Sequence, residues 1–125
     1  MTQSTHHARD IAFAYFEAMS RKDIDSIISL CSDQVVCTSP IGSTVGTVKF
    51  RAFQEGFSKM IIGLTLRAVH GDDHQATLIY QAQTYPVESS IVAELIQIND
   101  GKIISTEVIY DTAPFAEYMS SVITH

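Results

Sequence analysis

Positive charge is scarce in this sequence. Only 8 Lys and Arg residues stand against 14 Asp and Glu, which gives a formal net charge of −6, and no basic cluster is present. Binding to phosphates and to anionic lipid surfaces depends on positive charge. The composition therefore argues against nucleic acid and against a membrane surface as partners.

Long apolar runs and cysteines are also few. No run approaches the roughly 20 residues that span a bilayer, and residues 1–10 lack the basic segment and apolar core of a secretory signal. We therefore expect a cytoplasmic protein. The two cysteines, Cys31 and Cys37, are too few for a disulfide framework and lie in apolar patterns, so we expect both thiols to be free, buried and unreactive.

Motifs for metals, phosphates and nucleophilic catalysis are missing as well. The sequence has no Ser-His-Asp order, glycine-rich phosphate loop or zinc-ligand spacing. His70, Asp72, Asp73 and His74 are residue types that bind metals, but they span a glycine turn and have no matching second cluster. We interpret them as a solvated hairpin tip, and we expect neither a metal nor a cofactor.

The patterns that are present predict one domain over residues 1–125, a length that can bury one core. Apolar residues recur at helical spacing between residues 8 and 19, and Tyr15 lies on that stripe, so its hydroxyl should need a partner in the core. Asp23 is placed to cap a second helix that ends at residues 32–33. A third helix is predicted from Thr47 to Gly63, with Phe50, Phe53, Phe57 and Met60 on its buried face.

Strand patterns fill most of the remaining chain. A short strand is predicted at residues 35–37, and residues 38–43 should be irregular because Pro40 and Gly42 favour a turn. Four longer strands follow at residues 64–70, 75–85, 90–98 and 102–110, before a last helix that starts at residues 111–112. This order predicts an α+β cone, with helices packed on a curved antiparallel sheet that encloses a pocket.

One carboxylate, Glu94, interrupts an apolar strand. Ile91, Ala93 and Leu95 line one face of this strand, while apolar residues share the other face with Glu94, so both faces should be covered. Loss of solvation disfavours the charged form of a carboxyl group, which raises its pKa and lets the neutral acid donate a hydrogen bond. From this strand alone, a position of Glu94 at a rim or against a subunit partner is an equally good interpretation.

The chain resembles the ketosteroid isomerase group of the SnoaL-like, nuclear-transport-factor-2-like superfamily, over about residues 8–110. The residues that carry the resemblance are Tyr15, Asp23-Ile24-Asp25-Ser26-Ile27, Ser39-Pro40-Ile41-Gly42-Ser43, Gly46-Thr47 before Phe53, Arg67-Ala68-Val69 and the strand with Glu94.

This resemblance implies roles for three positions. Tyr15 falls where the family has an oxyanion-hole tyrosine, and Glu94 falls where it has a buried protonated acid that is one methylene shorter. In that family, the acid is kept protonated by a raised pKa. The isomerases carry their base immediately before the loop proline, where this chain has Ser39. An unassisted hydroxyl is too weak a base for that reaction, so we expect no classical steroid isomerisation.

Strand alternation then predicts the wall of the pocket. The residues that should surround a ligand are Ile41, Phe53, Ile79, Gln81, Gln83, Val92, Ile96, Ile104, Thr106, Val108 and Tyr110. The assignment depends on the strand register, since a shift by one residue exchanges the two faces. A mostly apolar wall with few polar groups suits a flat ketone, phenol or polyketide-like molecule.

Three functions are compatible with these patterns. The first is an enzyme that polarises a carbonyl or enol oxygen with Tyr15 and Glu94, in an isomerisation, cyclisation or dehydration. The second is a binding protein that has the pocket without the base. The third is a homodimer in which the sheet face with Ile91 packs against its twin. Two late acids take minor roles, with Glu107 pointing away from the pocket and Asp111 capping a helix.

Overall fold

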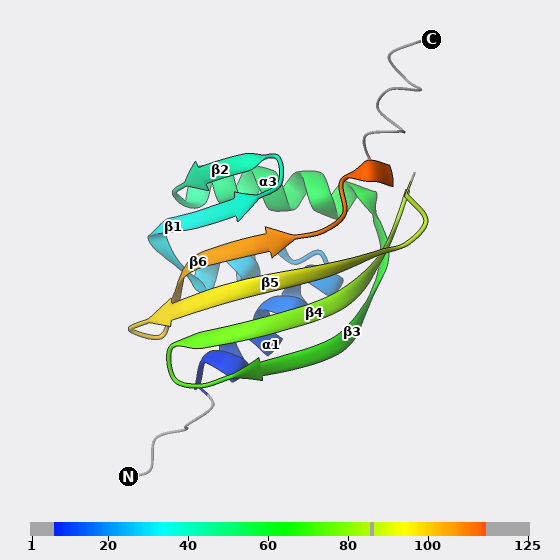
Figure 1. Ribbon diagram of the computed structural model, residues 1–125. Coiled ribbons are helices and arrows are strands. Elements are labelled where there is room, and N and C mark those ends of the chain that lie inside the picture. The colour runs from blue at the N-terminus through cyan, green and yellow to red at the C-terminus, as the bar shows by residue number, and fades with distance from the viewer. Residues whose placement is uncertain (1–6, 86, 115–125) are drawn as a thin grey trace.

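Six strands form one curved, mixed sheet in the order β2-β1-β6-β5-β4-β3, and the helices cover one of its faces (Figure 1). The structure is a computed structural model that describes residues 7–85 and 87–114. Its elements are α1 (His7–Ser20), α2 (Ile24–Ser29), β1 (Cys31–Ser39), β2 (Gly42–Val45), α3 (Thr47–Met60), β3 (Ile61–Gly71), β4 (Gln75–Thr84), β5 (Ser90–Asn99) and β6 (Lys102–Ile109). The predicted fold class is confirmed.

Helix α1 packs across β3, β4 and β5 through the predicted apolar stripe. Its buried residues are Ala8, Ile11, Ala12, Tyr15, Phe16, Ala18 and Met19. The start of the helix is tied to the β3–β4 turn, because the backbone N–H of Ala8 donates to the carbonyl oxygen of Asp72 at 3.0 Å. This packing directs the Tyr15 side chain toward the centre of the sheet, where it is 1% exposed.

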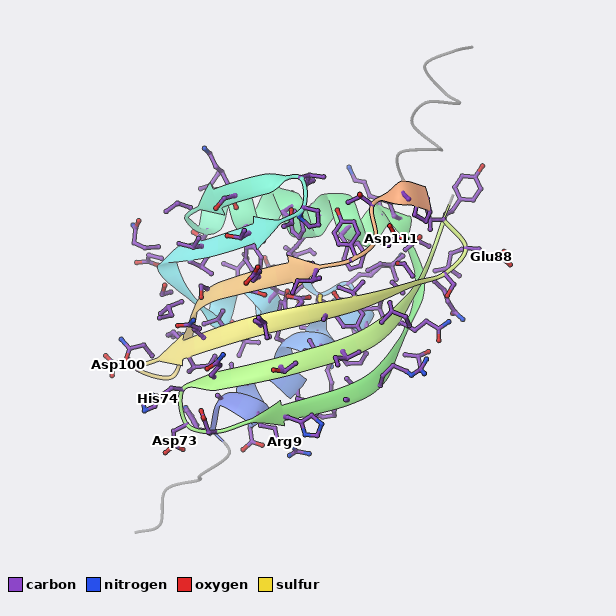
Figure 2. All side chains as sticks on the ribbon, in the orientation of Figure 1. Arg9, Asp73, His74, Glu88, Asp100 and Asp111 are labelled. Carbon is purple, nitrogen blue, oxygen red and sulfur yellow. The ribbon has the colours of Figure 1, made fainter. Side chains whose placement is uncertain are left out.

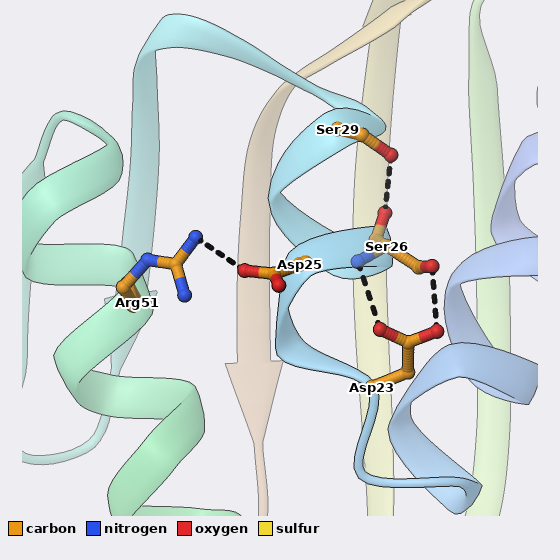
Figure 3. Close-up of polar contacts among 5 residues, drawn as sticks. All are labelled: Asp23, Asp25, Ser26, Ser29 and Arg51. Atoms are coloured by element: carbon orange, nitrogen blue, oxygen red, sulfur yellow. Dashed lines mark hydrogen bonds and ion pairs between the residues drawn. The ribbon is translucent and has the colours of Figure 1, made fainter.

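Helix α2 is short, and side-chain contacts hold its N-terminal turn (Figure 3). Asp23 caps it as predicted, accepting hydrogen bonds from the backbone N–H of Ser26 at 3.2 Å and from the Ser26 hydroxyl at 2.7 Å. Arg51 of α3 forms an ion pair with Asp25 at 2.9 Å. This contact joins the N-terminal part of α3 to α2, one turn before Gln54.

Three boundaries in the first half differ from the prediction. Helix α2 ends at Ser29, because Cys31 already begins a nine-residue strand whose buried positions alternate. The segment predicted to be irregular forms the β1–β2 hairpin, in which Gly42 has a φ of 141°. Helix α3 ends at Met60, three residues before Gly63, since Ile61 adopts extended geometry. Strand β2 is therefore an element that the sequence pattern missed.

The second half follows the predicted meander closely. The β5–β6 turn is a two-residue loop with positive φ at Asp100 (55°) and Gly101 (73°), the geometry that matches strand twist in a tight hairpin. Register shifts interrupt β3 between Ile61 and Gly63 and again between Leu66 and Ala68. Such bulges bend a strand and increase its twist. One pairing departs from the antiparallel expectation, because β1 runs parallel to β6.

The last helix predicted from the sequence involves Phe115, Tyr118, Met119 and Val122, which lie outside the described residues. Asp111 accepts a hydrogen bond from the backbone N–H of Ala113 at 3.0 Å, as expected of a capping residue. Within residues 7–85 and 87–114, no helix combines the length and the apolar character required to cross a membrane.

Candidate functional site

The Glu94 carboxyl group lies in the core and is surrounded by hydroxyl groups. The residue is 1% exposed. Its Oε1 accepts hydrogen bonds from Tyr15 at 2.8 Å and from Thr106 at 2.7 Å, and its Oε2 accepts one from Tyr80 at 2.7 Å. Neither ion pair found among the described residues involves Glu94. We call Glu94, Tyr15, Tyr80 and Thr106 the acid cluster.

Strand register explains why these side chains meet. Glu94 pairs with Leu78 on β4 and with Val108 on β6, and all three are buried on the helix-covered face. Side chains two residues apart share a face of a strand. Tyr80 therefore follows Leu78 onto this face, and Thr106 precedes Val108 on it. Helix α1 adds Tyr15 from above the sheet.

Two residues of α3 fix the Tyr15 ring. The amide nitrogen of Gln54 donates to the Tyr15 hydroxyl at 3.0 Å, and Gln54 is 2% exposed. Phe50, which is fully buried, stacks on Tyr15 with ring centroids 6.5 Å apart. Both residues lie on the buried side of α3, one turn apart. The Tyr15 hydroxyl thus has a donor on one side and an acceptor, Glu94, on the other.

Burial controls the ionisation of the acid cluster. Desolvation raises the pKa of Glu94 above its ordinary value, although hydrogen bonds from Tyr80, Thr106 and Tyr15 favour the charged form and oppose this effect. Desolvation and the nearby Glu94 raise the pKa of Tyr15 and of Tyr80 well above the ordinary tyrosine value. Both phenols consequently remain neutral hydrogen-bond donors.

The two cysteines are free and buried, as predicted. Cys37 lies beside Thr106 in the β1–β6 register, on the same face as the acid cluster. Burial raises the pKa of the Cys31 and Cys37 thiols to about 12, so neither is a thiolate near neutral pH.

Ser39 and Ile41 lie in the β1–β2 turn and outside the acid cluster. The Ser39 hydroxyl lies 3.4 Å from the carbonyl oxygen of Gly42, to which it donates, and accepts from the backbone N–H of Ile41 at 3.3 Å. These contacts stabilise the turn. The Ile41 side chain is 77% exposed. The structure therefore does not bring either residue to Glu94, although the sequence grouped all three.

The predicted positions of Ile79 and Gln81 on the Glu94 face are wrong. Ile79 pairs with Ala93 and Gln81 with Ile91, so both side chains lie on the opposite face of the sheet. Gln81 donates to the Ser89 hydroxyl at 2.8 Å and accepts from Arg67 at 3.4 Å there. The prediction assigned these residues to the wrong face because a shift of one residue in strand register exchanges the two faces of a sheet. Gln83, with the same parity as Gln81, is exposed.

Four of the other predicted wall residues are buried on the inner face of the sheet. Val92, Ile96, Thr106 and Val108 are between 0% and 6% exposed. Phe53 is half-buried and stacks on Phe50, and Tyr110 packs against the same core. Ile104 is half-buried at a register shift, where Ile103 takes the buried position opposite Ile98.

Sequence reasoning missed three polar residues of the inner face. Tyr80 occupies the same alternate positions as the apolar residues of its strand, and Gln54 lies within the apolar stripe of α3. The spacing in the sequence therefore indicated that both residues are buried. Thr44 of β2 pairs with Cys37, which places it on the inner face as well. Its hydroxyl oxygen is buried and has no hydrogen-bond partner among the described residues.

The predicted hairpin tip is separate from this site. Figure 2 shows Asp73 and His74 at the β3–β4 turn and Asp100 at the neighbouring β5–β6 turn, all at one end of the sheet. The Asp72 carboxylate accepts hydrogen bonds from the backbone N–H groups of His74 at 2.8 Å and Gln75 at 2.9 Å. Across the part of the chain that the structure describes, no three His, Cys, Asp or Glu side chains gather as a metal-ion cluster.

Comparison with known proteins gives consistent matches. The SnoaL-like domain family matches residues 12–106. A crystal structure of a protein from Kribbella flavida DSM 17836 is 32% identical, with coverage of 93% of this chain and 96% of that one and a TM-score of 0.88. No protein of curated function matches.

More distant structures share the fold. An NTF2-like protein of unknown function from Cytophaga hutchinsonii ATCC 33406 is 16% identical, covering 93% of this chain and 99% of that one, with a TM-score of 0.76. A second Kribbella flavida protein, provisionally described as a ketosteroid isomerase, is 16% identical, covering 87% and 81%, with a TM-score of 0.78. At this identity the likeness concerns the fold alone.

Proposed function

The chain belongs to the SnoaL-like domain family, and on this basis we propose that it binds a small apolar molecule through one oxygen atom at the acid cluster. The observation that carries the proposal is the fully buried Glu94 carboxyl, bonded by three hydroxyls without a described counter-charge. Burial of an acid in this way costs stability. A perturbed acid kept at that cost is a candidate for function.

The Thr44 hydroxyl gives independent support. Thr44, Cys37, Thr106 and Ile96 are consecutive partners across β2, β1, β6 and β5. The inner face thus carries a buried polar oxygen that lacks a partner among the described residues, in the same row as a member of the acid cluster. Such an oxygen loses a hydrogen bond on folding unless a guest supplies one. A ligand lying over the inner face of these strands would have polar partners on two sides and apolar walls elsewhere.

Binding fits the positions of the side chains better than proton-transfer catalysis. The base position of the isomerases is held by Ser39, whose hydroxyl is engaged in the β1–β2 turn. Glu94 is the acid of the cluster, but it accepts three hydrogen bonds, which favour the carboxylate and offset part of the basicity that burial gives it. We therefore propose a binding protein for a ketone, phenol or polyketide-like molecule, with isomerase, cyclase or dehydratase chemistry as the second candidate.

We expect Tyr15→Phe to weaken binding of oxygen-bearing bicyclic probes by about fivefold, because the Tyr15 hydroxyl orients the Glu94 carboxyl and one hydrogen bond in the cluster contributes roughly 1 kcal/mol. The probes are 1-tetralone and 1-naphthol, which share a skeleton and differ in the oxygen group. Calorimetric titration measures the affinity, and Tyr85→Phe on the exposed β4–β5 connection is the matched control. Failure of the wild-type protein to bind either probe would contradict the proposal.

Proton exchange distinguishes binding from catalysis. A binding protein leaves the hydrogens alpha to the 1-tetralone carbonyl unexchanged in deuterated water, as followed by NMR. Accelerated exchange that disappears in Tyr15→Phe would identify the enzyme instead, because an oxyanion donor is needed to stabilise the enolate.

We also propose that the open face of the sheet packs against a second copy of the chain. Ile79, Ala93 and Ile109 form one row across β4, β5 and β6 on this face. Ile91 and Ile109 are 51% and 45% exposed. An apolar sheet face of this kind is typical of an isologous interface.

A charge on this face should separate the two copies. We expect Ile91→Glu to sediment as a monomer at micromolar concentration while the wild-type protein sediments as a dimer. Val48→Glu is the control, because Val48 is 83% exposed on α3, on the other side of the sheet. A wild-type monomer under these conditions would overturn the proposal.

A further inference from the structure

The hydrogen bonds of the acid cluster have fixed directions. A tyrosine hydroxyl has one proton, and the Gln54 amide donates to the Tyr15 oxygen, so the Tyr15 proton is directed to Glu94 Oε1. Thr106 donates to the same oxygen. Oε1 therefore accepts two hydrogen bonds in either ionisation state of the acid.

The proton of a neutral Glu94 must then lie on Oε2. The partner of Oε2 is the Tyr80 hydroxyl at 2.7 Å. When Glu94 is ionised, Tyr80 donates its proton to Oε2. When Glu94 is neutral, Oε2 donates to the Tyr80 oxygen, and the Tyr80 proton has to turn to another acceptor.

We infer that the ionisation state of Glu94 selects the kind of oxygen that the site binds, with Tyr80 as the group that changes direction. The neutral acid releases the Tyr80 proton to a carbonyl oxygen, which can only accept. The ionised acid occupies all three hydroxyl protons and leaves a lone pair of Oε2 for a guest hydroxyl, such as a phenol or an enol. This inference rests on the proposed function and names its ligand class.

Among the described groups that surround Glu94, none other than Glu94 itself changes its charge near physiological pH. The titratable groups that act on it electrostatically are Tyr15 on α1, Tyr80 on β4, Cys37 and Cys31 on β1. All four are held neutral near physiological pH by their raised pKa values. Helix α3 and strand β6 contribute Gln54 and Thr106, which do not titrate.

The test is the pH dependence of affinity for 1-tetralone and 1-naphthol, from about pH 5 to about pH 8, where 1-naphthol keeps its proton. Affinity for 1-tetralone should fall, by up to tenfold per unit, as pH rises through the pKa of Glu94, and affinity for 1-naphthol should rise over the same range. Parallel slopes for the two probes would overturn the inference while leaving the proposed function standing. No binding of either probe would overturn both.

Two variants show whether Glu94 selects the ligand or only supports the structure of the site. Glu94→Gln holds a carbonyl oxygen toward Tyr15 and Thr106 and an N–H toward Tyr80, so it reproduces the neutral acid at every pH. Its affinities should lose their pH dependence, with 1-tetralone preferred throughout. Gln54→Leu removes the N–H that directs Tyr15 and should reduce the discrimination between probes severalfold, with the fold checked by circular dichroism. Opposite slopes that persist in Glu94→Gln would exclude Glu94 as the selecting group.

Discussion

Glu94→Leu should lower the free energy of unfolding by about 3 kcal/mol or more. The leucine fills most of the volume but leaves the Tyr15, Tyr80 and Thr106 hydroxyls without their acceptor in the core. Each buried donor that loses its partner costs about 1 to 3 kcal/mol. Urea denaturation followed by circular dichroism measures the loss, and the slope of the transition should stay near the wild-type value because the buried area is similar.

Two companion variants show whether the loss comes from the hydrogen bonds. Glu94→Gln keeps an acceptor oxygen and should destabilise the protein much less than Glu94→Leu. Glu55→Leu changes an exposed acid on α3, away from the sheet face proposed as an interface, and should have little effect. A Glu94→Leu protein as stable as the wild type would mean that relief from burying the carboxyl outweighs the lost hydrogen bonds, as happens for some buried charges.

Stability should fall as pH rises through the range in which Glu94 ionises. An unfolded glutamate has a pKa of about 4.3, and burial raises the pKa of Glu94 in the folded protein. Between these two values the folded state binds more protons than the unfolded state. The contribution of Glu94 is therefore fully present below the unfolded pKa, declines by up to about 1.4 kcal/mol per pH unit, and is lost above the folded pKa.

The difference between the wild-type protein and Glu94→Gln isolates this contribution. Asp23 and Asp72 act with the opposite sign at lower pH, since hydrogen bonds from Ser26 and from the backbone N–H of His74 lower their pKa values. Their effects are shared by both proteins and cancel in the difference. A difference in unfolding free energy that does not change with pH would show that Glu94 keeps an ordinary pKa.

The sequence was sufficient to pair Tyr15 with Glu94, two residues that are 79 positions apart. The helical stripe placed the tyrosine in the core, and the apolar strand placed the acid there. The resemblance to the isomerases connected the two. What the sequence did not reveal is that they bond to each other, which leaves Tyr15 without a free proton for a guest.

Strand β4 shows why the wall of the site was harder to predict. Its even positions, from Ala76 to Ala82, are apolar and buried, while Gln75, Thr77, Gln81 and Gln83 occupy odd positions. This alternation indicated the correct face, but Ile79 at an odd position obscured it. An isoleucine on the open face also suits the interface proposed with a second copy. Its apolar character therefore does not show that it lies in the core of a single chain.

The parallel pairing of β1 with β6 is not encoded locally. It joins residues about 70 positions apart, and the short β1 pattern gives no indication of direction. The missed strand β2 has a similar cause, because a four-residue edge strand that begins with a glycine is too short to show a strand pattern. Both depend on packing that forms only when the sheet is complete.

The two register shifts in β3 have a consequence for behaviour at high concentration. Strand β3 ends the sheet, and its 11 residues offer backbone groups to which a foreign strand can add. A regular ladder needs an unbroken series of donors and acceptors, and the bulges near Ile62 and Arg67 interrupt it, with a charge at the second. The longer of the two sheet edges that the structure describes is thus a poor template for aggregation or fibril growth.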